Sequence, residues 1–365
     1  MKKVLVTGVL GQDGANMCEY LLRQREKGNR YKVYGMIRRS ANPNFINCKS
    51  FLNDEDFQLV YGDLTDETSL DKLVKEIQPD YFINFAANSF VGISWDMPLH
   101  VFDVNTSGVI RCLEAIRKYQ PGCRFYSAGS SEQFGDVEYS PQDMKHPMKP
   151  RSPYGASKCA AHHIVKVYRE SYDMYAVHGV LFNHEGTKRG EEFVTRKITK
   201  GVARIRDEIV SVDNWRARHG QEARFAPIEL GNLEAKRDWS DSNDFIEGVW
   251  LMLNQDNPKD YLLASGETHS IREFVEKAFS AAGFDGDWEG EGVNEKYVSS
   301  GGKHKYVFVK INKEFYRPAD VELLLGDPAE TIRELGWKPK ISFDNLVKSM
   351  VQFDIKSCEK WKPKT

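Results

Sequence analysis

A tyrosine and a lysine four residues apart, Tyr154 and Lys158, could together move a proton on a small bound molecule. Pro153 tolerates the first turn of a helix and good helix formers follow it, so we expect a helix to begin here. Residues four apart on a helix share one face. A free phenol has a pKa of about 10, so Tyr154 needs a cation such as Lys158 to act as a base near neutral pH. Alone the pair is a weak signal, because Tyr-x-x-x-Lys also occurs by chance on amphipathic helices.

A hydroxyl and a carboxylate, Ser130 and Glu132, follow an expected strand at 124–128 and could complete the same site. Ser130 could hold a substrate oxygen near the tyrosine. A carboxylate beside a hydride-transfer site has a purpose where a second proton must move. Glu132 therefore favours a dehydratase over a plain dehydrogenase or an epimerase, the other interpretation being a loop carboxylate that faces water. We expect the catalytic group to be Ser130, Glu132, Tyr154 and Lys158.

The elements that must position these residues alternate between strand and helix from residue 1 to about residue 182. The apolar and β-branched runs that predict strands are 3–7, 32–37, 57–62, 81–85 and 124–128, and the pattern changes after 180–182. A helix is expected from about residue 100 to about residue 118. This alternation predicts an α/β, Rossmann-type, doubly wound parallel sheet with the site at its carboxyl edge.

A glycine-rich turn directly follows the first expected strand and precedes a helical pattern. It places Gly8, Gly11 and Gly14 in G-x-x-G-x-x-G spacing, which suits the short-chain dehydrogenase branch of dinucleotide folds. Glycines let the backbone approach a pyrophosphate, and the helix N-terminus offers free N–H groups to it. The alternative, a tight turn without a ligand, is weaker because the motif opens the chain in the right register.

The second strand ends in Arg38, Arg39 and Ser40, where an NAD site usually has an acidic residue for the ribose hydroxyl. Arginine at this place favours the 2′-phosphate of NADP, although a solvated basic loop is also compatible. Residues at the ends of the third and fourth strands complete the expected cofactor contacts. The residue-based cofactor set is Gly8, Gly11, Gln12, Asp13, Gly14, Arg38, Arg39, Ser40, Asp63, Leu64, Phe85, Ala86, Ala87, Ser89, Tyr154 and Lys158.

Composition and charge exclude several other classes. With 365 residues, 41% hydrophobic and 28% charged, the chain is an ordinary globular sequence, and its net charge of −2 gives no reason to expect nucleic acid or an anionic membrane as partner. The six cysteines show no metal-ligand spacing, which predicts buried, reduced thiols and no metal. The absence of a signal peptide and of a long apolar run predicts a cytoplasmic protein.

The pattern changes after residue 182, which suggests a second domain. We expect 1–182 to bind the dinucleotide and 183–365 to form mainly a smaller, discontinuous α/β cap, with the chain returning to the first domain around 230–280. A basic helix at 191–209, a loop at 216–221, the segment 230–239 and a helix at 242–253 are assigned to this cap, together with the segments 274–281 and 317–320. Its arginines and lysines favour a second phosphorylated ligand such as a sugar nucleotide.

Over nearly its whole length the chain resembles the GDP-mannose 4,6-dehydratase family of extended short-chain dehydrogenases/reductases. Besides the glycine turn and the Ser-Pro-Tyr to Lys158 stretch, the resemblance rests on more specific blocks. These blocks are 37–40, 130–132, 181–185, 193–197, 230–239, 266–270 and 315–318.

The resemblance implies an NADP-dependent conversion of GDP-mannose to GDP-4-keto-6-deoxymannose in a homo-oligomer, dimer or tetramer. In the implied cycle Tyr154 and Lys158 deprotonate the C4 hydroxyl during hydride transfer, and Glu132 with Ser130 removes water across C5 and C6. His184 and Arg189 match cofactor contacts. The residues that match GDP-sugar contacts are Ser89, Ser130, Glu132, Asn183, Lys197, Arg237, Arg317 and Glu322.

Departures from the family pattern keep alternatives open. Where the family usually has Gln-Ser-His, this chain has residues 88–90, and where the family has Glu-Ser-Pro-Arg, it has residues 185–188. Residues 41–45 stand in place of the family's Ser/Thr-rich run, and 210–227 resembles an insertion. A dehydratase of another GDP-sugar, for example GDP-manno-heptose, therefore remains the nearest alternative. A sugar-nucleotide epimerase and a non-catalytic NADP-binding sensor are the others.

Overall fold

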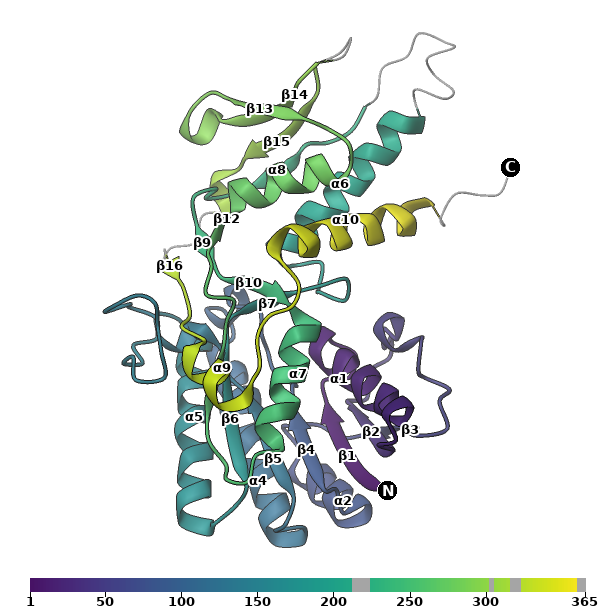
Figure 1. Cartoon of the computed structure of the whole chain (residues 1–365), viewed down its shortest axis with the longest axis vertical. Helices are drawn as coiled ribbons and strands as arrows, with labels where there is room; N and C mark the ends of the chain where they lie inside the picture. The colour runs from purple at the N-terminus through teal and green to yellow at the C-terminus, as the bar shows by residue number, and fades with distance from the viewer. Residues whose placement is uncertain (212–223, 302–304, 316–322, 360–365) are drawn as a thin grey trace. The chain divides into compact units, whose positions relative to one another are not determined.

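The computed structural model describes residues 1–211, 224–301, 305–315 and 323–359 (Figure 1). The chain divides into two compact units. Unit 1 comprises 1–184, 238–267 and 324–340, and unit 2 comprises 185–237, 268–323 and 341–365. Each unit is therefore assembled from three separate stretches of the chain.

Unit 1 is built on a seven-stranded sheet in the order β11-β6-β5-β4-β1-β2-β3. Every neighbouring pair in it is parallel. The strands are β1 (Lys2–Thr7), β2 (Tyr31–Ile37), β3 (Phe57–Tyr61), β4 (Tyr81–Asn84), β5 (Arg124–Ala128), β6 (Ala176–Leu181) and β11 (Tyr261–Leu263). The strand order reverses between β1 and β4, and ligands bind such sheets outside the carboxyl ends at that point. The expected doubly wound parallel sheet is confirmed.

Helices cover the sheet because each buries an apolar stripe. The helices α2 (Glu67–Ile77), α4 (Gly108–Tyr119) and α5 (Pro153–Tyr172) pack side by side, and their buried residues form one core with strand residues such as Phe82 and Phe125. A further pair, α1 (Gln12–Arg23) and α7 (Ser242–Leu253), also packs together. Trp250 of α7 lies against the ring of Tyr81, with 4.8 Å between centroids.

Unit 2 has its own sheet and core. Its four strands are ordered β13-β14-β15-β8, with bounds β8 (Ile228–Leu230), β13 (Gly286–Glu289), β14 (Lys296–Ser299) and β15 (Val307–Ile311). Three helices pack against one another, namely α6 (Val194–Ser211), α8 (Ile271–Ala281) and α10 (Phe343–Glu359). A buried ion pair between Arg196 and Asp354, which also accepts from Thr199, links α6 to α10.

The remaining elements are short. They are α3 (Pro98–Phe102), α9 (Ala329–Leu335), β7 (Asn183–Glu185), β9 (Lys236–Arg237), β10 (Trp239–Asp241), β12 (His269–Ser270), β16 (Leu323–Leu324), the 3-10 turns η1 (Gln24–Lys27), η2 (Ile46–Cys48), η3 (Gly92–Ser94), η5 (Ser131–Gln133), η8 (Gly292–Asn294) and η9 (Lys313–Phe315), and the π-helical turn η4 (Asp103–Ser107).

Four local expectations were wrong. Helix 242–253 forms as α7 but belongs to unit 1, because its largely buried surface packs against α1, β5 and β6 rather than within the cap. The helix expected at 100–118 is interrupted by η4. The helix expected from residue 191 begins at Val194, after a turn. Two of the six cysteines, Cys159 and Cys358, are only partly buried. The loop expected at 216–221 lies outside the described residues. Among the helices of the described residues, none is long and apolar enough to cross a membrane.

Candidate active site

The helix α5 begins as its sequence predicts and delivers Tyr154 and Lys158 from its first two turns. Ser152 is the N-cap, and its hydroxyl accepts a hydrogen bond from Gly155 N at 3.0 Å, while Pro153 occupies the first helical position. Both Tyr154 and Lys158 are buried. Lys158 Nζ lies 5.9 Å from the centroid of the Tyr154 ring, so the ammonium and the phenol share one face of the helix.

The ammonium of Lys158 is tied to the end of strand β5. Its Nζ donates a 2.7 Å hydrogen bond to Ala128 O. Burial lowers the pKa of Lys158 to about 8, since a charge removed from water is disfavoured, although the negative charge of Asp13 partly offsets this. A lysine held here can stabilise a neighbouring phenolate below that pH.

Glu132 lies in the turn η5, which follows β5, and Ser130 directly precedes that turn. We call residues Ser130–Gln133 the serine–glutamate turn. Ser130 is its N-cap: its Oγ accepts from Glu132 N at 3.3 Å, and its own N–H donates to Gln133 Oε1 at 2.9 Å. The turn packs on α5 so closely that a Cβ at Gly155 would lie 2.5 Å from Glu132 O. The structure therefore brings Ser130 and Glu132 beside the first turn of the helix that bears Tyr154.

A side chain that the sequence reasoning missed joins α5 to the loop after β4. Asn105 lies in the π-helical turn η4 and is buried. Its Nδ2 donates to Ser157 Oγ at 3.0 Å and to Asn88 O at 3.1 Å, and its Oδ1 accepts from Asn88 N at 2.9 Å. Single π-helical turns often mark functional positions in helices. The polar sequence of η4 inside an otherwise apolar helical pattern was the available signal.

The glycine turn between β1 and α1 is shaped by backbone contact. Gly8 has φ +69°, and a Cβ there would lie 2.9 Å from Ala86 N. A Cβ at Gly14 would lie 2.4 Å from Gly8 O, and Gly11 N donates to Gly8 O at 2.9 Å. The helix α1 has Gly11 as N-cap without a side-chain cap bond. Its first N–H groups are therefore not satisfied by a capping side chain, as an anion site requires.

His184 and two polar residues of α1 form a further contact in unit 1. Gln12 Nε2 donates to His184 O at 3.0 Å, and Asp13 Oδ2 lies 3.0 Å from His184 Nε2. The His184 ring also stacks on Phe245, with centroids 4.8 Å apart. Within the described residues, Gln12 Oε1 is buried and has no hydrogen-bond partner. His184 and Asp13 are thus placed beside the glycine turn.

The other cofactor candidates of unit 1 also follow carboxyl ends of strands. Arg38, Arg39 and Ser40 follow β2 and are exposed. Leu64, after β3, is buried, whereas Asp63 is partly exposed and caps its own turn by accepting from Thr65 N at 2.9 Å. The loop after β4 comprises Phe85, Ala86 and Ala87, which are partly exposed, and Ser89, which is exposed.

Asn183, a substrate candidate, is a partly exposed residue of β7 in unit 1. The candidates Arg189 and Lys197 lie in unit 2. The guanidinium of Arg189 covers the Phe193 ring at 3.5 Å, and its Nε lies 3.1 Å from Glu185 Oε2. Lys197 Nζ lies 3.6 Å from the centroid of Phe315, and burial lowers the lysine pKa.

The remaining candidates are Arg237, which is buried and donates to Lys236 O at 2.8 Å, and Arg317 and Glu322, which lie outside the described residues.

Comparison with known families gives a match over most of the chain. The family model described as GDP-mannose 4,6 dehydratase matches residues 5–350. The GDP-mannose 4,6 dehydratase of Drosophila melanogaster is 41% identical over 98% of this chain and 87% of its own length. The human enzyme of the same name is 41% identical over 96% of this chain and 91% of its own length.

Solved structures share the fold. A dTDP-glucose 4,6-dehydratase from Streptomyces venezuelae, solved with NAD and TYD bound, superposes with a TM-score of 0.79 at 20% identity and covers 99% of both chains. A UDP-glucose 4-epimerase from Thermotoga maritima superposes with a TM-score of 0.76 at 19% identity, covering 98% of this chain and 99% of its own. Because this fold serves both reactions, the choice between them depends on the site residues.

Proposed function

The chain belongs to the GDP-mannose 4,6-dehydratase family, and from this premise we propose that it converts GDP-mannose to GDP-4-keto-6-deoxymannose. The observation on which the proposal depends is the serine–glutamate turn packed against the first turn of α5. This packing supports a second acid–base group, Glu132, in the same site as Tyr154 and Lys158. An epimerase has little use for such a group.

We propose NADP as the cofactor, and the glycine turn fits a dinucleotide. A Cβ at Gly8 or Gly14 would clash with neighbouring backbone atoms, so only glycine allows this tight turn. A turn of this kind lets a diphosphate approach the backbone closely. Arg38 and Arg39 at the end of β2 suit a 2′-phosphate. The remaining contacts of the proposed set are Gly11, Gln12, Asp13, Ser40, Asp63, Leu64, Phe85, Ala86, Ala87, Ser89, Tyr154, Lys158, His184 and Arg189. When bound, NADP supplies the hydride acceptor and donor of the cycle.

The chain's own residues move the protons in the proposed reaction. Tyr154, as phenolate stabilised by the Lys158 ammonium, accepts the proton of the sugar C4 hydroxyl. The ketone at C4 acidifies the C5–H bond, and Glu132 accepts that proton. Glu132, with Ser130 as hydrogen-bond donor, then protonates the leaving C6 hydroxyl, and water departs. When C6 is reduced, the proton held by Tyr154 returns to the sugar at C5, so the net loss is one water molecule.

The proposed GDP-sugar contacts follow the family resemblance residue by residue. We propose Ser89, Ser130, Glu132, Asn183, Lys197 and Arg237, together with Arg317 and Glu322 outside the described residues. The partly buried Lys197 ammonium is a suitable partner for an anionic phosphate, because anion binding would offset the burial that lowers its pKa.

The direct test is incubation of the purified protein with GDP-mannose and no added NADP(H). We expect a product lighter by one water, which mass spectrometry detects, because the bound cofactor is regenerated in each cycle. A product of unchanged mass would instead support an epimerase. Absence of any product with GDP-mannose would overturn the proposal.

A substrate panel addresses the sugar. The sequence at Glu185–Lys188 departs from the family pattern, so GDP-manno-heptose should be compared with GDP-mannose at equal concentration. A higher kcat/KM with the heptose would reassign the substrate within the same chemistry. Assembly as a dimer or tetramer stays a prediction.

A further inference from the structure

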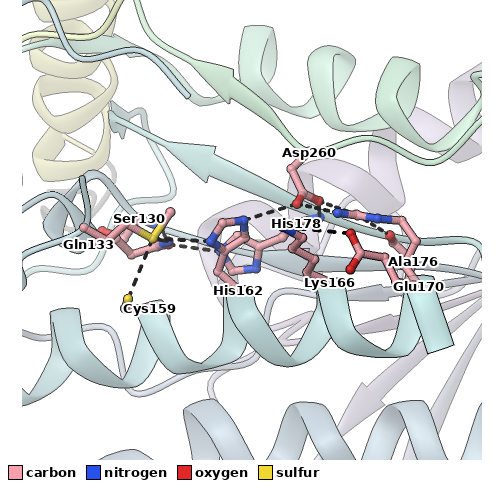
Figure 2. Close-up of polar contacts among 11 residues, drawn as sticks. Ser130, Gln133, Cys159, His162, Lys166, Glu170, Ala176, His178 and Asp260 are labelled. Atoms are coloured by element: carbon pink, nitrogen blue, oxygen red, sulfur yellow. Dashed lines mark hydrogen bonds and ion pairs between the residues drawn. The ribbon is translucent and has the colours of Figure 1, made fainter. Parts of the chain in front are cut away.

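A buried polar network adjoins the serine–glutamate turn and extends along α5 to Asp260 (Figure 2). Its centre is Gln133, which is fully buried. Gln133 Oε1 accepts two hydrogen bonds, one from Ser130 N at 2.9 Å and one from His178 Nε2 at 3.0 Å. A carbonyl oxygen has two lone pairs, so both are filled. The Gln133 amide thus connects the backbone of Ser130 to a side chain on the neighbouring strand β6.

The donors and acceptors of this network follow from chemistry. A backbone N–H can only donate, so the Gln133 atom facing Ser130 N must be the oxygen rather than the nitrogen. The same oxygen can only accept from His178, so Nε2 of the imidazole bears the proton. Burial, followed by the charge of His162, holds the pKa of His178 well below its ordinary value, while Asp260 opposes this. The ring is therefore a neutral Nε2–H donor at working pH.

His178 is itself held on its strand by a buried carboxylate. His178 N donates to Asp260 Oδ1 at 2.7 Å. Arg169 binds both oxygens of Asp260, at 2.6 and 2.8 Å, and His162 Nε2 lies 3.2 Å from Oδ2. Burial would raise the pKa of Asp260, but the hydrogen bonds of Arg169 and His162 outweigh it and hold the pKa below the usual range. The carboxylate thus stays charged and anchors His178.

The space for this network is provided by a glycine. A Cβ at Gly129 would lie 2.3 Å from His178 Nε2 and 2.6 Å from Gln133 Oε1. Gly129 N also donates to Gly179 O at 2.8 Å, so the strand end and the turn are held at a fixed distance from β6. Contacts this close leave the Gln133 amide little freedom to rotate.

We propose that Gln133 and His178 are positioning residues. The His178 imidazole fixes the Gln133 amide, and this amide holds the backbone of Ser130. Glu132, two residues further on, is thereby kept in the reactive arrangement. This inference rests on the proposed function, in which Ser130 and Glu132 act on the sugar. Rates fall steeply when a reacting group is misplaced by about 1 Å, so loss of the support should lower kcat more than it changes substrate binding.

The first experiment measures the turn itself and needs no turnover. Amide hydrogen exchange of a peptide spanning 129–134 should be about fivefold faster in Gln133→Leu and His178→Leu, as expected for one lost hydrogen bond. His178→Gln should exchange like the wild type, because its side-chain amide can donate at the place of Nε2. Unchanged exchange in both leucine variants would overturn the proposal.

The second experiment measures turnover of GDP-mannose. We expect kcat to fall about tenfold in both leucine variants with KM changed less than about twofold, and His178→Gln to restore kcat. Tyr175→Phe is the matched control, because it removes hydrogen bonds to Met252 O and Gln255 O just before the same strand β6 begins. A purely structural network would make His178→Gln as slow as His178→Leu, which would contradict the donor role. If the wild type gives no dehydrated product, the proposed function fails, while the exchange measurement still decides this inference.

Discussion

The glycine turn after β1 and the serine–glutamate turn after β5 both lie at carboxyl ends of strands in one parallel sheet, yet they are held in different ways. The glycine turn is fixed by its own backbone, through Gly11 N to Gly8 O and through contacts that admit no Cβ at Gly14. The serine–glutamate turn is fixed by buried side chains from distant parts of the chain. Backbone contacts therefore determine the shape of the proposed cofactor site, whereas buried side chains position the proposed acid–base groups.

The difference matters because the two turns have different tasks. A diphosphate is bound by many N–H groups and tolerates small displacements of any one of them. Proton transfer depends on one or two atoms placed within hydrogen-bond reach of the reacting group. We therefore expect substitutions in the two turns to affect different measurements.

The largest effect is expected for Glu132→Gln, which alters the serine–glutamate turn only. Loss of one general acid–base group typically costs about 10²- to 10⁴-fold in rate, so dehydration of GDP-mannose should fall by about 10³-fold. Binding of NADP, measured by calorimetry, should stay within about twofold of the wild type. Full dehydratase activity in this variant would remove Glu132 from the mechanism.

Gly14→Ala should break the glycine turn and leave the other intact. Its Cβ would lie 2.4 Å from Gly8 O, so the backbone must shift, at a cost of about 1–3 kcal/mol. We expect NADP affinity to fall at least about tenfold and the free energy of unfolding to fall by that cost. Gly122→Ala is the control, since a Cβ there meets nothing within 4 Å. Equal NADP affinity in both variants would contradict the backbone account of this turn.

Lys158 connects α5 to the strand that leads into the serine–glutamate turn, and its pKa makes a prediction about stability. Burial lowers this pKa to about 8 from 10.5, so between these values the unfolded chain binds more protons than the folded one. Stability of the wild type should therefore rise with pH in that window relative to Lys158→Met, by up to about 1.4 kcal/mol per pH unit. Urea unfolding of both proteins at about pH 7 and about pH 9 measures the difference. If the free energies of unfolding of the two proteins changed with pH in the same way, Lys158 would not be buried as a free amine.

The smallest effect is expected for Arg38→Ala. The side chain is exposed after β2, so its interaction with a 2′-phosphate is weakened by water, and we expect NADP affinity to fall about fivefold. Affinity for NAD should not change. Lys49→Ala, another exposed basic residue, is the matched control. Equal losses of affinity for NADP and for NAD would show that Arg38 does not bind the 2′-phosphate.

The sequence predicted what depends on neighbouring residues. The helix start at Pro153 and the alternation of strands and helices over the first 182 residues follow from local patterns, and the structure confirms them. The network behind Ser130 was not predictable, because Gln133, His178 and Asp260 lie 45 and 82 residues apart and look like unrelated polar positions. The helix 242–253 was assigned to the cap, although the chain was expected to return to the first domain around 230–280, because its partners α1 and β6 are distant in sequence. Arg317 and Glu322 lie outside the described residues, so their roles stay predictions.

In the proposed reaction, oxidation at C4, loss of water and reduction at C6 occur on one sugar in one site. Turnover of GDP-mannose labelled with deuterium at C4 distinguishes this internal hydride transfer from exchange with solution. We predict that the deuterium appears at C6 of the 4-keto product, without dilution by added unlabelled NADPH. Deuterium lost to the added cofactor, or retained at C4 of an unchanged or epimerised sugar, would contradict it.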